Sequence, residues 1–598
     1  MKSLLLSRKD LDFLLFDWLR VEDLISRDRF AEHSRETFSD TLDLCEQLAT
    51  RYFAPHNKKS DAHEPTFDGT KVTVIPEVKE ALAACAEAEL MGMAMDYRLG
   101  GAQLPATVAQ AGFVWLMAAN VSTAGYPMLT MANLNLLAKF GTEEQIDAFV
   151  KPMIAGRFTG TMCLSETQAG SSLADITTRA EPRADGTFRL FGSKMWISGG
   201  DHELSDNIVH LVLAKIPGGP AGTKGISLFI VPKYLVNPDG SLGERNDVVL
   251  AGLNHKMGYR GITNTVLNFG EGVHQPAGEP GAVGYLVGDE HRGLNYMFHM
   301  MNEARLGVGM GAIALGYTGY LKSLEYARNR PQGRPAGSKD PAAPQVAIIE
   351  HADVKRMLLA QKSYVEGALA LALYCARLVD LANTAESDDE REHATALLDI
   401  LTPIAKSWPS QWCLAANDLA IQVHGGYGYT REYDVEQHYR DNRLNPIHEG
   451  THGIQSLDLL GRKVVQRNGA SLAALHAVMT QSIAAGRQAG GESAEAAAQL
   501  DAVVQRLVTV TAGMFAAGDI DAALANSAIY LVAFGHVVIA WIWLEQILAA
   551  QGRSGDFFDG KRQAARYFFR YELPKTGPQL DLLQSLDRTT LEMRPDWF

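Results

Sequence analysis

The chain has 598 residues, of which 46% are hydrophobic and 21% are charged, a composition typical of a soluble globular protein. This length exceeds one ordinary domain several-fold, so we expect several domains with full cores. The net charge of -14 argues against nucleic acid or an anionic membrane surface as a partner, because domains that bind phosphates are usually basic.

Residues 1–35 are expected to form an N-terminal helical extension. The opening run MKSLLLSRKDLDFLLFDW has only three consecutive leucines before Arg8, too few for the apolar core of a signal peptide. The cysteines are odd in number and far apart, which fits a reducing compartment: Cys45, Cys85, Cys163, Cys375 and Cys413. The sequence therefore predicts a cytoplasmic protein.

Residues 36–160 are predicted to form a helical domain. Apolar residues recur three and four apart in its longer stretches, which are Phe38–Phe53, Glu77–Met91, Val108–Ala119 and Thr130–Phe140. After Arg157 the period changes to two, and turn residues bound each segment. Residues 161–284 are therefore predicted to form an antiparallel β-domain, with strands in TFRLFG, IVHLVLAKI, GISLFIVP and NTVLNFG.

Helical periodicity returns at Gly293, and residues 285–467 are predicted to form a bundle of long helices. A proline-rich loop at 331–344 separates the first helix from two others, one ending near Ala382 and one running over Ala394–Val423. Residues 468–598 are predicted to form an additional helical domain with a loop at 484–498. Its apolar run Ala528–Leu544 contains Gly535 and His536, which favours a buried helix over a membrane span.

Two motifs lie where helices give way to strands. TMCLSETQAGSSLADI, residues 161–176, places hydroxyls and accessible N–H groups on one turn, which suits the oxygens of a nucleotide cofactor or is simply a polar turn. In GSKMWISGG, residues 192–200, Trp196 is either a platform for a flat ring system or an ordinary core tryptophan.

Two more motifs lie in the predicted bundle. A helix ends at Gly425 and Gly426, a pair that lets the backbone approach a ligand or a neighbouring chain, or that caps the helix. In NPIHEGTHGIQSLDLLGRK, Pro446 and the following apolar spacing place Glu449 on a turn before a helix. Glu449 is either a functional carboxylate or a residue that stabilises the helix start.

Together, in this order and with these spacings, LSETQAGSS, KMWIS, HKMGYRG, HGGYGYTREY and HEGTHGIQ resemble the acyl-CoA dehydrogenase family of flavoproteins. The resemblance covers roughly residues 31–463, and the extra residues at both ends resemble the family's long branch of about 600 residues. It implies an N-terminal helical domain, a middle β-barrel, a C-terminal four-helix bundle and an extra C-terminal helical domain.

The resemblance also implies an FAD-dependent α,β-desaturation of an acyl-CoA, with Glu449 as the base that removes the α-proton. An α-proton beside a thioester is removable when donors stabilise the enolate oxygen and the base lies in a water-poor pocket. The implied substrate is a fatty acyl-CoA or 3-methylmercaptopropionyl-CoA. An electron-transferring flavoprotein is the implied acceptor, and the minimum assembly is a homodimer or a dimer of dimers. No metal is implied.

Carried over position by position, the resemblance assigns binding residues. The cofactor residues are Met162, Leu164, Ser165, Gly170, Ser171, Trp196, Ser198, Arg330, Gln332, Gln422, Gly425, Gly426 and Thr451. Those from Arg330 to Gly426 resemble the positions through which a second subunit grips the FAD pyrophosphate and adenosine. The substrate residues are Ser171, Asn302, Arg305 and Gly450, although Arg305 also reads as an exposed helix arginine.

Three residues depart from the family pattern. His448 stands where a tyrosine is usual, Gly333 replaces a phenylalanine, and Gly453 replaces a glutamine. Glu303 lies one residue before the position that carries the base in some relatives, about 100° round a helix, so Glu449 is preferred. Two alternatives stay open: an acyl-CoA oxidase or flavin monooxygenase on the same scaffold, and a non-catalytic FAD-bearing binding protein.

Overall fold

The computed structural model describes residues 3–338, 340 and 342–598, and its contacts divide the chain into two compact units. The barrel unit comprises Glu36–Pro105 and Gly112–Gly307. The helical unit comprises Met1–Arg35, Ala106–Ala111 and Val308–Phe598. The predicted domain limits at residues 35, 160, 284 and 467 stay a prediction.

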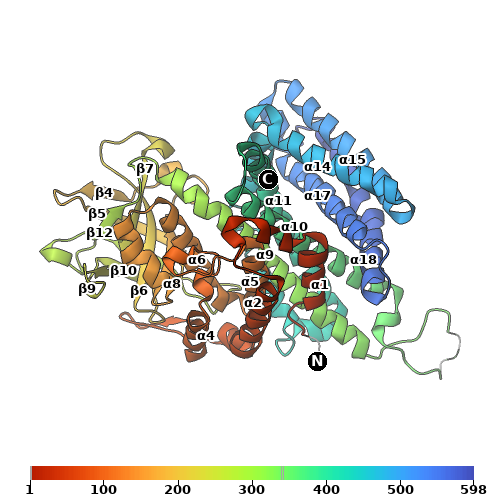
Figure 1. Ribbon diagram of the computed structural model, residues 1–598, viewed down its shortest axis with the longest axis horizontal. Helices are drawn as coiled ribbons and strands as arrows, with labels where there is room; N and C mark the ends of the chain where they lie inside the picture. The colour runs from red at the N-terminus through yellow and green to blue at the C-terminus, as the bar shows by residue number, and fades with distance from the viewer. Residues whose placement is uncertain (1–2, 339, 341) are drawn as a thin grey trace. The chain divides into compact units, whose positions relative to one another are not determined.

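Helices and a closed sheet make up the barrel unit (Figure 1). Its helices include α2 (Arg35–Leu48), α3 (Asn57–Ala62), α4 (Pro76–Glu87), α5 (Ala106–Ala119, of which the part from Gly112 belongs here), α6 (Val121–Phe140), α7 (Glu143–Gln145) and α8 (Lys151–Ile154). A buried asparagine fixes α6 to the sheet, because the Nδ2 of Asn133 donates to the carbonyls of Thr161 at 3.0 Å and Val209 at 2.9 Å.

The strands confirm the predicted middle β-barrel. They are β3 (Phe158–Cys163), β4 (Arg179–Pro182), β5 (Phe188–Ser198), β6 (Asn207–Lys215), β7 (Ile226–Pro232), β10 (Val248–Leu253), β11 (Asn264–Phe269) and β12 (Ala282–Leu286). The order β5, β12, β7, β6, β4 returns to β5 and closes the ring. Two short ladders, β1 (Thr66–Phe67) with β2 (Val72–Thr73) and β8 (Tyr234–Val236) with β9 (Leu242–Arg245), stand apart.

The prediction of a purely antiparallel domain was wrong. Strand β6 pairs in parallel with β3 and, at one residue pair, with β4. Period-two alternation gives the buried face of a strand but not the direction of its partner, since that depends on the connections. Inside the barrel, Leu190, Val212 and Phe229 are fully buried.

Long helices form the helical unit. They are α9 (Gly293–Asn329, of which the part after Gly307 belongs here), α10 (Ala352–Asn383), α11 (Asp388–His424), α12 (Val435–Asn442) and α13 (His452–Asp458). The predicted helices before Arg330, up to Ala382 and over Ala394–Val423 correspond to α9, α10 and α11. Pro403 and Pro409 both lie inside α11.

The extra C-terminal helices, blue in Figure 1, are α14 (Ala470–Ala489), α15 (Gly491–Ala516), α16 (Ile520–Ala525), α17 (Ser527–Ala549), α18 (Asp556–Tyr567), α19 (Thr576–Gln584) and α20 (Thr589–Glu592). The predicted loop at 484–498 was wrong, because α14 and α15 are separated only at Gly490. Alanine and glutamate favour helix strongly enough to extend both helices. Gly486 remains in α14, where a Cβ would come within 2.8 Å of Ala497.

The N-terminal segment packs within the helical unit. Here α1 (Arg8–Asp12) leads into a π-helical stretch, Phe13–Trp18. The Trp18 ring stacks on Tyr374 at 6.1 Å, and its indole N–H donates to Glu545 at 3.1 Å. This segment therefore joins α10 to the extra C-terminal helices.

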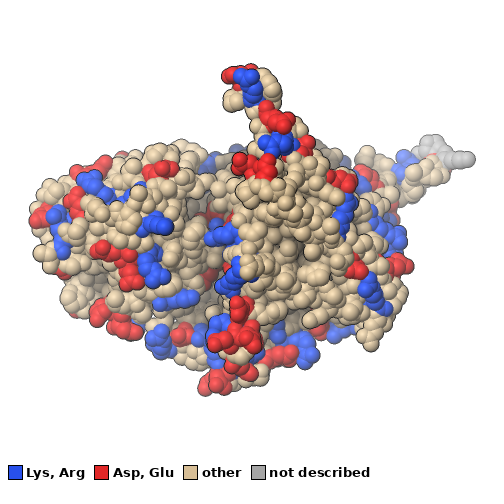
Figure 2. Space-filling view, turned by 90° about the horizontal axis from the view of Figure 1, so that it is seen from above, with Lys and Arg blue, Asp and Glu red and all other residues tan. Residues whose placement is uncertain are grey.

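Helix α17 is the one helix among the described residues that is long and apolar enough to cross a membrane by length and composition. Within the protein, 83% of its most apolar window is buried, as in a core helix. On the face drawn in Figure 2, acidic and basic side chains of the described residues are interspersed.

Candidate active site

A buried carboxylate organises the Ser165 loop, which we define as Leu164–Thr178 in the barrel unit. Glu166 accepts hydrogen bonds from the N–H and hydroxyl groups of Thr177 at 2.7 and 2.8 Å. Thr178 donates in the same way at 3.0 and 2.6 Å, and Lys194 of β5 forms a 2.9 Å ion pair. Both charged side chains are almost wholly buried. The loop that carries Ser165, Gly170 and Ser171 is therefore held at both ends.

The ion pair makes the Ser165 loop sensitive to acid. Burial alone would raise the pKa of Glu166, but the Lys194 charge and the hydrogen bonds outweigh it and lower the pKa to about 2. A carboxyl with a depressed pKa stabilises the fold above its unfolded value of about 4.5, and this contribution is lost as the pH falls toward 2.

The Glu166→Gln variant is expected to lower the free energy of unfolding at pH 7 by about 2 kcal/mol, because Lys194 loses its counter-charge in the interior. The difference from the wild type should shrink as the pH falls from 4.5 toward 2. Denaturation midpoints measured across this range would check it. The control is Glu181→Gln, which removes a half-exposed partner of Arg179. Equal effects of the two variants would contradict the prediction.

Trp196 is exposed at the end of β5, beside the Ser165 loop. The residue is 58% exposed and its backbone has a left-handed φ of +67°. The preceding Met195 N–H donates to the Ser165 carbonyl at 2.9 Å, and Asn264 donates to the Ser198 hydroxyl at 3.2 Å. A bulky residue in this region of φ and ψ costs about 1–3 kcal/mol and is typical of functional sites. Trp196 is therefore not a core tryptophan.

The predicted substrate residues Asn302 and Arg305 lie on the part of α9 that belongs to the barrel unit. Arg305 is 3% exposed, so its interpretation as an exposed helix arginine was wrong. Its guanidinium reaches Asn302 Oδ1 at 3.5 Å. Glu303, on the same helix, instead accepts a 3.0 Å hydrogen bond from Asn135 of α6. Burial raises the pKa of Glu303 to about 7.

In the helical unit, Glu449 lies on a strained turn immediately before α13. Glu449 and Gly450 have φ values of +52° and +91°. Thr451 caps α13 by accepting from the Ile454 N–H, and Gln455 donates to the Glu449 carbonyl at 3.0 Å. A Cβ on Gly450 would meet the Gln455 side chain at 2.6 Å, which explains the glycine. The sequence correctly placed Glu449 on a turn before a helix.

Two histidines beside Glu449 stay neutral. Burial, followed by the nearby Lys406 charge, lowers the pKa of His448 to about 3 and that of His452 to about 4. His452 also contacts the Ser407 hydroxyl. The turn that carries Glu449 therefore gains no positive charge from these rings at neutral pH.

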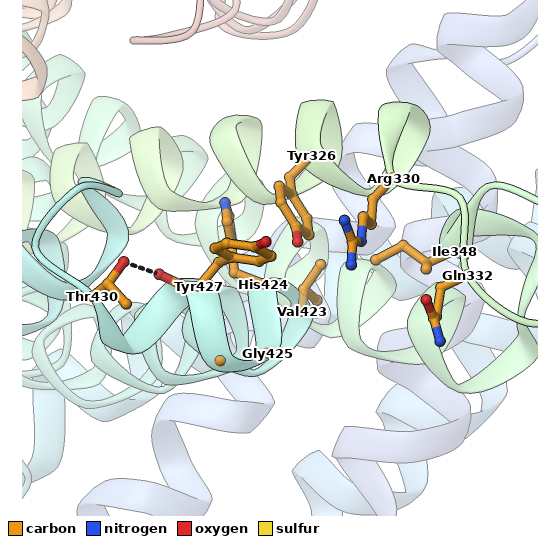
Figure 3. Close-up of a pocket in the computed structure, with 10 residues that line it drawn as sticks. Tyr326, Arg330, Gln332, Ile348, Val423, His424, Gly425, Tyr427 and Thr430 are labelled. Carbon is orange, nitrogen blue, oxygen red and sulfur yellow. Dashed lines mark hydrogen bonds between the residues drawn. The ribbon is translucent and has the colours of Figure 1, made fainter.

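A hollow of about 470 Å³ in the helical unit brings together four of the predicted cofactor residues, Arg330, Gln332, Gly425 and Gly426 (Figure 3). A Cβ on either glycine would have nothing within 4 Å, so their backbone is open to a ligand. Gln422, the remaining residue predicted to bind the second subunit's FAD, is exposed on α11, and its carbonyl accepts the Gly425 N–H.

Aromatic residues also line this hollow, and sequence reasoning missed them. Tyr326 stacks on His424 with ring centroids 4.3 Å apart, and the Arg330 guanidinium lies 5.5 Å from the Tyr427 ring. Tyr427 is half exposed, and the Thr430 hydroxyl donates to its carbonyl at 2.8 Å (Figure 3). The aromatic spacing in HGGYGY is the signal that could have identified Tyr427.

Four protein-family models of acyl-CoA dehydrogenase domains match consecutive parts of the chain. "Acyl-CoA dehydrogenase, N-terminal domain" matches residues 36–157, and "Acyl-CoA dehydrogenase, middle domain" matches 161–271. "Acyl-CoA dehydrogenase, C-terminal domain" matches 291–464, and "Acetyl-CoA dehydrogenase C-terminal like" matches 472–594. The chain belongs to the acyl-CoA dehydrogenase family. It is an oxidoreductase of that family.

Two full-length relatives are similar to this acyl-CoA dehydrogenase. The 3-methylmercaptopropionyl-CoA dehydrogenase of Ruegeria pomeroyi is 34% identical over 93% of both chains. The broad-specificity linear acyl-CoA dehydrogenase FadE5 of Mycobacterium tuberculosis is 33% identical over 98% of both chains. The predicted membership of the long branch is thereby confirmed.

Two solved structures share the fold. The Bacillus anthracis acyl-CoA dehydrogenase complexed with FAD has a TM-score of 0.74 at 19% identity, covering 94% of this chain and 93% of its own. Caenorhabditis elegans ACDH-11 in complex with C11-CoA has the same TM-score at 18% identity, covering 99% and 91%.

Proposed function

We propose that this acyl-CoA dehydrogenase desaturates an acyl-CoA thioester between Cα and Cβ, with Glu449 as the base that removes the α-proton. The observation that carries the proposal is the left-handed Glu449 on a turn closed by Gly450, the Thr451 cap and Gln455. A non-glycine residue persists in that conformation only when its surroundings determine it, which is typical of catalytic positions.

The Ser165 loop and the adjoining ends of β3 and β5 fit the flavin ring system. An exposed, strained Trp196 offers an aromatic face, and the hydroxyl of Ser165 and the N–H groups from Gly170 to Ser171 offer polar partners. Met162, Leu164 and Ser198 complete this proposed set. Bound FAD supplies the acceptor of the β-hydride, at N5. Thr451 is proposed to contact the cofactor, and Asn302, Arg305, Ser171 and Gly450 the CoA thioester.

The hollow of Figure 3 fits the dinucleotide part of FAD, because Arg330 offers a cation, Gln332 an amide, and Gly425 and Gly426 an open backbone. Gln422 of α11 completes this proposed set. By the family resemblance, this FAD would belong to a second subunit. We therefore propose a homodimer as the minimum assembly, in the cytoplasm, with an electron-transferring flavoprotein as the acceptor.

The Arg330→Met variant is expected to weaken FAD binding by about tenfold or more, because a charge-assisted contact to phosphate is lost. Fluorescence titration of the flavin-free protein with FAD would measure this. The control is Arg328→Met in the last turn of α9, because the Arg328 side chain is exposed and does not line the hollow. If both variants bind FAD as the wild type does, Arg330 does not hold the cofactor.

The substrate is proposed to be 3-methylmercaptopropionyl-CoA or a linear fatty acyl-CoA, as the names of the two full-length relatives suggest. Anaerobic mixing of the FAD-loaded protein with both kinds of thioester, in a series of chain lengths, tests the reaction and the substrate together. Rapid bleaching of the flavin by one class identifies the substrate class. If none bleaches the flavin, the desaturation proposal is wrong.

A further inference from the structure

Three buried asparagines connect the Glu449 turn to α9 and α11. Asn417 of α11, Asn442 of α12 and Asn445 are all fully buried. Asn445 Nδ2 donates to Asn442 Oδ1 at 2.8 Å, and Asn442 Nδ2 donates to Asn417 Oδ1 at 2.7 Å. This amide chain ends on His448, whose Nε2 lies 2.9 Å from Asn445 Oδ1.

Backbone carbonyls fix the direction of every hydrogen bond in the amide chain. Asn417 Nδ2 faces the Leu315 carbonyl at 2.9 Å, and Asn442 Nδ2 also faces the Ala312 carbonyl at 3.1 Å. A carbonyl can only accept, so both amides must direct their NH₂ groups toward α9. Each oxygen then faces the next NH₂ group, and Asn445 Oδ1 can only accept from His448. His448 must therefore carry its proton on Nε2, which leaves Nδ1 as an acceptor.

A buried lysine holds the backbone on both sides of the same turn. Lys406 of α11 is fully buried. Its ammonium donates to the Asn445 carbonyl at 2.9 Å and to the Gly450 carbonyl at 2.6 Å. One charged group thus fixes the peptide that follows Asn445 and the peptide that follows Gly450, with Glu449 between them. Hydrogen bonds from a charged donor in the interior are roughly twice as strong as neutral ones.

We propose that Lys406, Asn442 and Asn445 are positioning residues for Glu449, with Lys406 fixing the turn and the amide chain fixing His448 as its Nε2–H tautomer. This inference rests on the proposed role of Glu449 as the base. The left-handed conformation of Glu449 needs such support, because a displacement of about 1 Å at a reacting group can lower a rate by about 10²-fold. The histidine that replaces the family's usual tyrosine is thus integrated into a chain of asparagines.

The first test follows the ring of His448 rather than the reaction. In Asn445→Asp the side chain keeps its shape but cannot donate to Asn442, and it places a carboxylate against the imidazole. Asn445 contacts this ring, and the nearby charge of Lys406 from α11 disfavours its protonation. In FAD-loaded protein, NMR titration should show His448 charging about 1 to 3 pH units higher than in the wild type. An unchanged titration would overturn the amide chain.

The second test measures the proton-transfer step with Lys406→Met. Anaerobic flavin reduction by a reactive acyl-CoA should slow by about 10²-fold, with FAD bound and with acyl-CoA affinity changed less than threefold. Lys463→Met is the matched control, because it also removes a buried lysine charge, one that pairs with Asp399 at 2.7 Å. Equal rates in the two lysine variants would overturn the role of Lys406.

The two tests separate this inference from the proposed function. If no acyl-CoA reduces the wild-type flavin, the base assignment fails, while the His448 titration still decides whether the amide chain exists. Should Lys406→Met fail to fold, Asn445→Asp supplies both measurements, since it is isosteric. Normal reduction and a wild-type His448 titration in Asn445→Asp would then contradict the positioning role.

Discussion

Glu449→Gln is expected to abolish reduction of the flavin by acyl-CoA, with a rate lower by about 10³-fold or more. The amide keeps the size and shape of the carboxylate, so the turn and the FAD should be retained. It cannot take a proton, and general base catalysis of this kind contributes about 10²- to 10⁴-fold by itself. Stopped-flow absorbance of the flavin under anaerobic conditions measures the effect directly.

The matched control for this experiment is Glu303→Gln. Glu303 lies closest in the chain to the position that carries the base in some relatives, and burial raises its pKa to about 7. Its carboxylate is instead engaged by Asn135 at 3.0 Å and lies 3.8 Å from His299. We expect reduction in Glu303→Gln to stay within about tenfold of the wild type, as for a residue outside the proton transfer. Loss of reduction in Glu303→Gln with retention in Glu449→Gln would reverse the assignment.

The sequence sufficed for features with a local physical cause. Pro446 and the apolar spacing after it predicted the turn of Glu449 and helix α13, and period-two segments predicted the main barrel strands. The prediction of a loop at 484–498 was wrong because the helix propensity of the alanines there outweighs the effect of the glycines. The parallel pairing of β3 with β6 could not be read from either strand, since it depends on their connections.

The supporting residues of the candidate site could not be predicted, because they are adjacent only after folding. Nothing in the run around Lys406 indicates that its ammonium reaches two carbonyls of a turn that lies far along the chain. The hollow lined by Tyr326 and Tyr427 is built from residues at the end of α9 and residues at the end of α11, which are far apart in the sequence. Motif spacing finds the residues that touch ligands, whereas the residues that hold them in place depend on tertiary packing.

The same limitation applies to a buried charge cluster that joins the N-terminal segment to the extra C-terminal helices. Lys561 of α18 is fully buried and forms ion pairs with Asp10 and, at 2.9 Å, with Glu366. It also donates to Gln546 at 2.9 Å, while the Tyr317 hydroxyl donates to Asp10 at 2.9 Å. Segments from α1, α10, α17 and α18 thus share one cation.

Lys561→Met is expected to lower the free energy of unfolding of the helical unit by about 3–5 kcal/mol. Methionine replaces most of the volume but leaves the Asp10 and Glu366 carboxylates in the interior without their shared cation. Denaturant midpoints would report the loss, with Lys355→Met as the control because Lys355 forms an exposed pair worth at most about 1 kcal/mol.

A second variant separates loss of charge from loss of packing. In Asp10→Asn with Lys561→Met, one of the two stranded carboxylates is neutral and the other still contacts Lys362. We expect this double variant to recover part of the stability that Lys561→Met loses, since an uncompensated buried charge is the main cost of breaking such a pair. If the double variant is no more stable than Lys561→Met, the lysine acts through packing against Phe13, Trp543 and Phe557, whose ring centroids lie 5.4 to 5.8 Å from its ammonium.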